Sequence, residues 1–212
     1  MSERLATLSF DDGGWQDFHV VEVLNQFRVP ATFYLPAGAL SRLHFHCRPE
    51  ELPGRYKGHE IGCHSWSHAE PEEALCEYQR EVVEARQELR RQFDQPVECF
   101  AFPYGQPAPG LEFALERAGF RWARTAVACA NDLRMPHARF RQPITAMLHV
   151  PESYMPAAYA AFPHLHFVAH SYDLHERRLE PALARLIMSC RGLGMRFVTN
   201  SEFFAAMETA GA

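Results

Sequence analysis

The chain has 212 residues, of which 47% are apolar and 22% are charged, the proportions of a soluble globular protein with one sizeable core. Its formal net charge is −5 and Lys57 is its single lysine, which argues against nucleic acid as a partner because nucleic-acid-binding surfaces concentrate positive charge. No apolar stretch approaches the ~20 residues of a membrane span, and the six cysteines form no Cys-x-x-Cys pair, which favours buried reduced thiols.

Strand-like and helix-like segments alternate along the chain. The predicted strands span residues 5–10, 31–35, 60–64, 97–102, 120–125, 139–144, 165–170 and 195–199. The predicted helices span residues 15–27, 71–93, 109–118, 151–162, 181–191 and 201–207. Residues 36–58 are rich in Pro, Gly and His and are predicted to be irregular. This alternation indicates an α/β fold of parallel strands wrapped by helices, with residues 1–212 as a single domain.

Two adjacent carboxylates, Asp11 and Asp12, follow the first predicted strand and precede Gly13. Neighbouring side chains on an extended backbone point apart, so the pattern predicts two different roles: one carboxylate ligates while the other stays free nearby. The alternative is a solvated turn, or the N-cap of the helix that follows.

His64 and His68 follow the third predicted strand, four residues apart. If this segment turns helically, the two imidazoles share one face, which is the usual geometry of a two-histidine metal clamp. One carboxylate and two imidazoles suit a divalent metal, and a second carboxylate can act as the base in hydrolysis. The alternative is a pair of surface histidines.

Two further segments carry candidate catalytic groups. Pro103-Tyr104-Gly105 ends the fourth predicted strand in a tight turn, from which the Tyr104 N–H can serve an oxyanion, unless the turn is an ordinary one. His170 follows an apolar strand and can act as a general acid toward a leaving amine. Asp173 is its candidate partner, or else a helix-capping acid.

The segments 9–13, 58–68, 102–105 and 168–170 resemble, in this order, the successive motifs of the polysaccharide deacetylase family, which shares the NodB-homology domain. The resemblance spans nearly the whole chain, and its second motif is the most specific. It implies a distorted (β/α) barrel with about seven parallel strands. It also implies a metal-dependent N-deacetylase, a hydrolase acting on carbon–nitrogen bonds other than peptide bonds.

The resemblance further implies roles for individual residues. Asp12, His64 and His68 look like the ligands of a divalent metal, zinc in the first place, with cobalt and nickel as alternatives. Asp11 looks like the general base and His170 like the acid that protonates the leaving amine. The remaining implied positions are the oxyanion turn and an apolar wall of the acetyl pocket: Pro103, Tyr104, Gly105 and Val168.

Three departures mark the chain as a divergent member. The family often has an arginine two residues before the motif proline, where this chain has Ala101; Arg124 and Arg141 are candidate substitutes from a neighbouring strand. The family's Asp–Trp motif has no match in residues 120–150. The last motif reads His-Ser-Tyr-Asp at residues 170–173, where the family usually has His-Asp.

The first predicted strand begins at residue 5, which leaves no room for a signal peptide, so we expect a cytoplasmic protein. The expected partner is therefore a carbohydrate or other small molecule: an N-acetylated sugar or a glycoconjugate precursor. Two alternatives remain: a metal-dependent amidase or deformylase on another C–N bond, and a non-catalytic carbohydrate-binding descendant. Asp11 favours an enzyme, because metal binding does not need it. Nothing in the sequence specifies an oligomeric state.

Overall fold

The computed structural model describes residues 3–69, 75–107, 110–128, 139–149, 151–154 and 159–210. In this part of the chain, nine strands form one sheet in the order β6-β5-β4-β3-β2-β1-β8-β7, with β9 beside β1. All of their pairings are parallel. The strands are β1 (Arg4–Asp11), β2 (Thr32–Leu35), β3 (Glu60–Cys63), β4 (Cys99–Ala101), β5 (Trp122–Ala128), β6 (Gln142–Ile144), β7 (Ala146–Leu148), β8 (Leu165–His170) and β9 (Met195–Phe197).

The two end strands of this sheet are consecutive in the chain, and they close it into a barrel. Only Thr145 separates β6, which pairs with β5, from β7, which pairs with β8. The Thr145 N–H donates to the His166 carbonyl at 2.7 Å, so the connection itself is tied to β8. Eight of the nine strands form the ring, and they count as seven when β6 and β7 are treated as one strand; β9 lies outside it. This confirms the predicted distorted (β/α) barrel.

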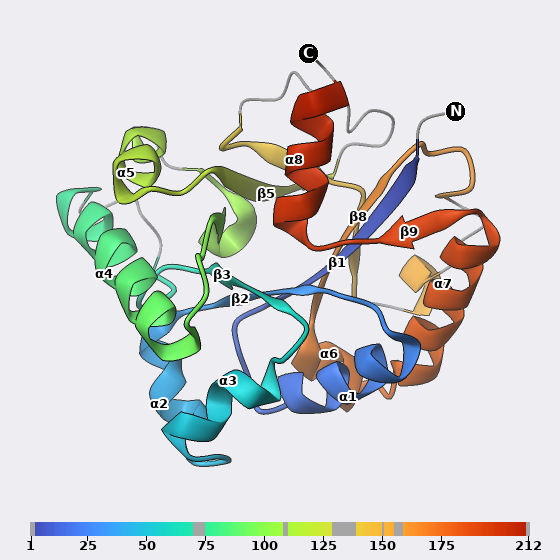
Figure 1. Ribbon diagram of the computed structural model, residues 1–212, viewed down its shortest axis with the longest axis horizontal. Coiled ribbons are helices and arrows are strands. Elements are labelled where there is room, and N and C mark those ends of the chain that lie inside the picture. The colour runs from blue at the N-terminus through green and yellow to red at the C-terminus, as the bar shows by residue number, and fades with distance from the viewer. Residues whose placement is uncertain are drawn as a thin grey trace.

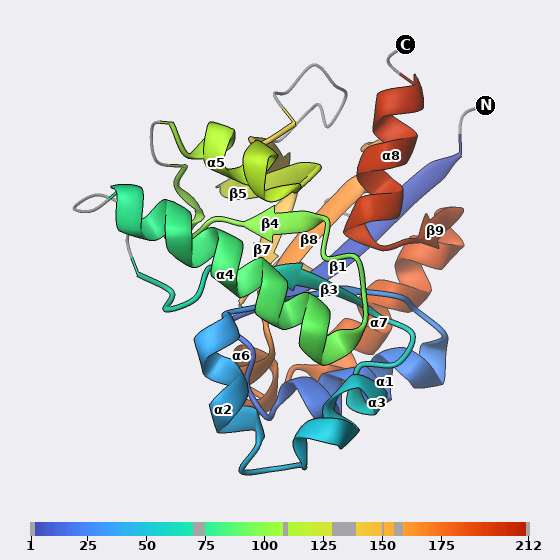
Figure 2. The same ribbon diagram turned by 60° about the vertical axis from the view of Figure 1, so that its left-hand side comes forward.

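Helices cover the outside of the barrel (Figure 1). They are α1 (Asp17–Phe27), α2 (Leu40–Leu43), α3 (Leu52–Arg55), α4 (Leu75–Phe93), α5 (Leu111–Ala118), α6 (Ser171–Glu176), α7 (Glu180–Gly192) and α8 (Asn200–Ala210). Helix α4 packs against α5, and α1 packs against both α6 and α7 (Figure 2). None of the helices in the described ranges is long and apolar enough to cross a membrane.

Most predicted elements are confirmed; the errors concern short helices and the three-residue strand β7, which was not predicted. Residues 36–58 were expected to be irregular but contain α2 and α3, and α6 was not predicted at all. Helices of four to six residues are too short to show a periodic apolar pattern. Residues 151–154 form a 3₁₀ turn where a longer helix was expected, and 155–158 lie outside the described residues, as does the predicted start of α4 at residue 71.

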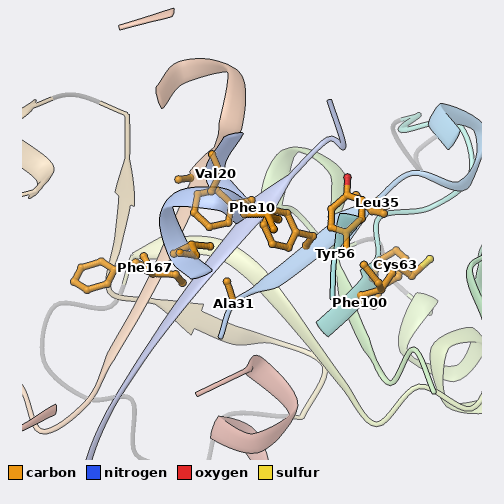
Figure 3. Close-up of a cluster of buried hydrophobic side chains, with 14 of the residues drawn as sticks. Phe10, Val20, Ala31, Leu35, Tyr56, Cys63, Phe100 and Phe167 are labelled. Atoms are coloured by element: carbon orange, nitrogen blue, oxygen red, sulfur yellow. The ribbon is translucent and has the colours of Figure 1, made fainter. Parts of the chain in front are cut away.

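The main core lies between the barrel strands and the covering helices. Phe10 of β1, Phe100 of β4 and Phe167 of β8 are each at most 1% exposed, and Val20 of α1 packs with the same cluster (Figure 3). Burying each such side chain contributes about 1.5–3 kcal/mol. Four cysteines are free and buried, as the sequence predicted for the thiols: Cys47, Cys63, Cys99 and Cys190. The Cys76 side chain and Cys129 lie outside the described residues.

Asp17, in the first turn of α1, is a fully buried carboxylic acid. Its Oδ2 accepts a hydrogen bond from the Tyr56 hydroxyl at 2.8 Å. Burial raises the pKa of Asp17 to about 7, because the ionised form loses its hydration and the hydrogen bond from Tyr56 offsets this only in part.

This raised pKa predicts how stability depends on pH. An aspartate in the unfolded chain has a pKa of about 3.9. Between pH ~4 and ~7 the folded state therefore keeps a proton that the unfolded state has already lost. The contribution of the protonated Asp17 to the unfolding free energy is complete below this window and is lost as pH rises through the folded-state pKa. Asp17→Asn, which keeps a neutral group, should therefore flatten the decline in unfolding free energy from pH 4.5 to 7.5 in urea titrations. An unchanged slope would contradict the raised pKa.

Candidate metal and catalytic site

The polar residues singled out in the sequence lie where the barrel strands β1, β3 and β8 end. Asp11 is the last residue of β1 and His170 is the last of β8, and the two are register partners. His64 directly follows β3. Because the carboxyl ends of parallel barrel strands share one rim, residues far apart in sequence meet there.

Asp12, His64 and His68 converge on one point. Asp12 Oδ1 lies 3.4 Å from His64 Nε2 and 3.2 Å from His68 Nε2. The three donor atoms lie within 4.8 Å of one another. Burial acts to raise the pKa of Asp12, but the two histidines outweigh it and hold that pKa well below its usual range. The carboxylate is therefore ionised and faces both rings.

This donor set fits a divalent metal ion. Asp12 Oδ1 is buried without a hydrogen-bond partner, the state expected of an atom reserved for a ligand. His64 Nδ1 donates to the Ala101 carbonyl at 2.8 Å, so Nε2 is the ring nitrogen that faces Asp12 and can bind a ligand. One carboxylate and two imidazoles from protein, with further positions left for water or substrate, are typical of catalytic zinc sites and also suit cobalt or nickel.

The two histidines meet through a loop and not through the helical turn that was one possibility for residues 64–68. Ser65 and His68 adopt the left-handed backbone region, with φ of 64° and 61°. The His68 N–H donates to Ser65 Oγ at 3.0 Å and holds this conformation. Asp12 and Tyr104 also have positive φ, 74° and 56°. Each such residue costs about 1–2 kcal/mol, and strain of this kind concentrates at functional sites.

Asp11 forms an ion pair with Arg124 rather than joining the three donors. Arg124 is 1% exposed, and its guanidinium lies 4.6 Å from the ring centroid of Tyr34. It is also the register partner of Ala101 on the neighbouring strand. The other candidate, Arg141, instead pairs with Glu112 at 2.6 Å. Of the two candidate arginines, Arg124 is therefore the one that places a guanidinium beside Asp11.

His170 lies on the other side of Asp12. Its Nδ1 lies 3.3 Å from Asp173 Oδ2, and its Nε2 lies 3.8 Å from Asp12 Oδ2. Asp173 belongs to α6 and contacts the histidine directly, which favours the partner role over a simple cap. Tyr172 donates to Asp12 Oδ2 at 3.1 Å and stacks on the His170 ring, with centroids 4.9 Å apart. Tyr172 was not predicted from the sequence as a site residue. Its position within the last motif, residues 170–173, is the feature that could have indicated it.

The turn after β4 completes the rim. Residues 103–105 form a 3₁₀ turn in which the Gly105 N–H donates to the Phe102 carbonyl at 2.8 Å. The Tyr104 ring packs against His68, with centroids 4.9 Å apart. Pro103 is buried and anchors this turn.

A cavity of about 280 Å³ lies beside the donors. Tyr104, Gly105, Arg124 and His170 line it together with Asp11 and the three candidate ligands. Its apolar wall comes from Phe102, Ala126 and Met147. Val168 is fully buried within β8 and is not among the residues that line this cavity.

Gly105 is required by the geometry of this turn. Its φ is +72°, and an added Cβ would contact the side chain of Ala126 and lie 2.7 Å from the Ala126 backbone nitrogen. We expect Gly105→Ala to lower the unfolding free energy by about 2 kcal/mol or more, through left-handed strain and overpacking. Gly192→Ala is the matched control, because nothing lies within 4 Å of a Cβ there. Urea denaturation of both variants tests this, and equal stabilities would contradict it.

Comparison with known proteins adds an independent line of evidence. A family model described as polysaccharide deacetylase matches residues 1–123, more than half of the chain. A family 4 carbohydrate esterase from Bacillus anthracis is 20% identical, with a TM-score of 0.67, and the match covers 96% of this chain and 84% of that one. These structural similarities, at such low identity, show the fold.

Two other solved structures match over a similar extent. A family 4 acetyl xylan esterase from Clostridium thermocellum, in complex with a cobalt ion, is 19% identical, with a TM-score of 0.65 and coverage of 95% of this chain and 91% of that one. A mutant of a CE4 family pseudoenzyme is 15% identical, with a TM-score of 0.68 and coverage of 95% and 67%. The same barrel therefore occurs in esterases and in a pseudoenzyme.

Proposed function

The chain belongs to the polysaccharide deacetylase family, and from this membership we propose that it is a metal-dependent hydrolase that removes the acetyl group from an N-acetylated sugar or glycoconjugate precursor. The family indicates deacetylation of acetylated sugars. The observation that carries the finer proposal is the convergence of Asp12, His64 and His68, with Asp11 beside them and His170 across from them. We also propose that residues 1–212 act as one domain, in support of which the described strands share a single sheet.

In this proposal Asp12, His64 and His68 hold the metal. A divalent ion bound there supplies Lewis-acid polarisation of the acetyl carbonyl and lowers the pKa of water. Asp11 takes the proton from the attacking water, as general base. Its ion pair with Arg124 keeps the carboxylate turned into the cavity, away from the three ligands.

His170 and Tyr104 serve the other half of the reaction. An amine leaves poorly until it is protonated, and His170 delivers that proton to the amide nitrogen. Asp173 holds the His170 ring through Nδ1, which leaves Nε2 turned toward the cavity. The Tyr104 backbone N–H, in a turn fixed by Pro103 and Gly105, is the proposed donor to the developing oxyanion.

The test is an assay of the purified protein with zinc, cobalt or nickel against three kinds of substrate. These are N-acetylglucosamine oligomers, a formylated amino sugar, and allantoin as a cyclic ureide. We expect acetate release from the first, lost with a chelator and restored by metal. Turnover of the formyl or ureide compound alone would replace the proposal with the amidase alternative. Bound metal without turnover of any of them would favour a non-catalytic protein.

A further inference from the structure

A second, larger cavity adjoins the catalytic one. It has a volume of about 560 Å³ and shares with the catalytic cavity Asp12, His68, Tyr104 and Tyr172. It extends from these residues toward the 36–58 segment, where Arg42 and His46 form part of its wall. Its size is in the range of small-molecule sites, with room for groups beyond an acetyl-bearing ring. Whatever part of the substrate extends from the reacting sugar in this direction meets these two side chains.

Arg42 is the arginine among the described residues that line this wall. Of the described residues that line it, Asp12 is the one acid, and its carboxylate is already committed to the two metal-site histidines. Arg42 is exposed, and in the described part of the chain no carboxylate pairs with its guanidinium. Arg48, six residues on, is instead paired with Glu51 at 2.7 Å and does not line the cavity. The 36–58 segment thus pairs Arg48 with a carboxylate and leaves Arg42 facing the cavity.

Aromatic rings fix the shape of the same wall. The His46 ring stacks on Trp15, with centroids 5.7 Å apart, and His175 makes an edge contact with Trp15 at 4.9 Å. Trp15 and Tyr104 both line the cavity and offer apolar faces suited to a sugar ring. Arginine is the side chain best suited to planar, bidentate recognition of carboxylate or phosphate. The wall therefore combines surfaces for a sugar with an unpaired cation.

We propose that the substrate is an acidic N-acetylated sugar, whose phosphoryl or carboxylate group is bound by Arg42, with His46 beside it, while the acetyl group occupies the catalytic cavity. This inference rests on the proposed function and adds the class of substrate to it. It predicts a preference for anionic over neutral N-acetyl sugars of the same size.

Steady-state kinetics test this preference. The substrates are N-acetylglucosamine, N-acetylglucosamine 6-phosphate and N-acetylmuramic acid, which distinguish a neutral sugar, a phosphate ester and a carboxylate. We expect kcat/KM to be at least ~10-fold higher for one or both acids, and Arg42→Ala to lower it by about 10-fold to 100-fold for the preferred acid. Arg42→Lys should keep part of the preference, and Arg48→Ala, the matched control, should keep all of it. Equal kcat/KM for all three sugars, or a preference that survives Arg42→Ala, would overturn the inference.

A binding measurement separates this inference from the proposed function. Calorimetry with Asp11→Asn and with Asp11→Asn/Arg42→Ala, both metal-loaded, measures affinity for the three sugars without turnover. If an acid binds more tightly and this depends on Arg42, while the unaltered metal-loaded protein turns over no acetyl sugar, the anion site is supported and the deacetylase is overturned. Turnover of neutral sugars with no effect of Arg42 on binding or rate would overturn the anion site and leave the deacetylase standing.

Discussion

Replacing Asp12 with alanine is expected to abolish retention of a divalent metal and to lower kcat/KM for an N-acetylated sugar by about 10³-fold or more, because the ion supplies several kcal/mol of charge stabilisation. Asp12 Oδ1 faces both imidazole Nε2 atoms, at 3.4 and 3.2 Å. Without it, two histidines remain, and two neutral ligands bind a divalent ion far more weakly than three that include a carboxylate. Elemental analysis of the purified variant measures the loss directly.

Two further variants make this test specific. His64→Ala should lose the metal in the same way, and its fold should survive because the lost hydrogen bond is a single contact with the Ala101 carbonyl. His149→Ala is the matched control: this histidine is exposed, its Nδ1 contacts the Met147 carbonyl at 3.1 Å, and it belongs neither to the three donors nor to the lining of the catalytic cavity. Full metal content in Asp12→Ala or His64→Ala would remove the proposed ligand set.

The sequence predicted the members of this site better than their geometry. Asp12 and His64 could be placed because each follows a short apolar strand, and strand ends meet on one rim in a parallel barrel. The shape of the loop from His64 to His68 could not be predicted, because it depends on two residues in the left-handed backbone region, neither of them a glycine. A four-residue spacing favours a helix when only the pattern is available.

A single sequence does not predict which side chains of neighbouring strands contact one another. Arg124 and Arg141 were equal candidates for the missing guanidinium, and the choice depends on register: Arg124 lies opposite Ala101, whereas Arg141 lies before β6 and pairs with Glu112. Tyr172 was missed for a related reason, since its contact with Asp12 joins residues 160 positions apart. Local patterns carry no information on such long-range pairs.

Replacing Asp11 with asparagine is expected to keep the metal and to lower kcat by a factor of about 10² or more, the usual contribution of a general base. Asp11 does not belong to the group of three converging donors, so metal content should stay near that of the unaltered protein. The amide fills the same volume but cannot accept the proton of the attacking water. Steady-state kinetics combined with elemental analysis measure both effects on one sample.

The buried partner of Asp11 complicates this experiment and also provides its control. Arg124 is 1% exposed, and removing its counter-charge leaves a buried cation, which costs about 3–5 kcal/mol. A loss of activity in Asp11→Asn could thus reflect instability, so Asp11→Asn/Arg124→Gln should be measured beside it. The double variant removes both charges, and we expect it to regain stability in urea titrations yet remain inactive. If it, or Asp11→Asn itself, turns over substrate at the rate of the unaltered protein, Asp11 is not the base.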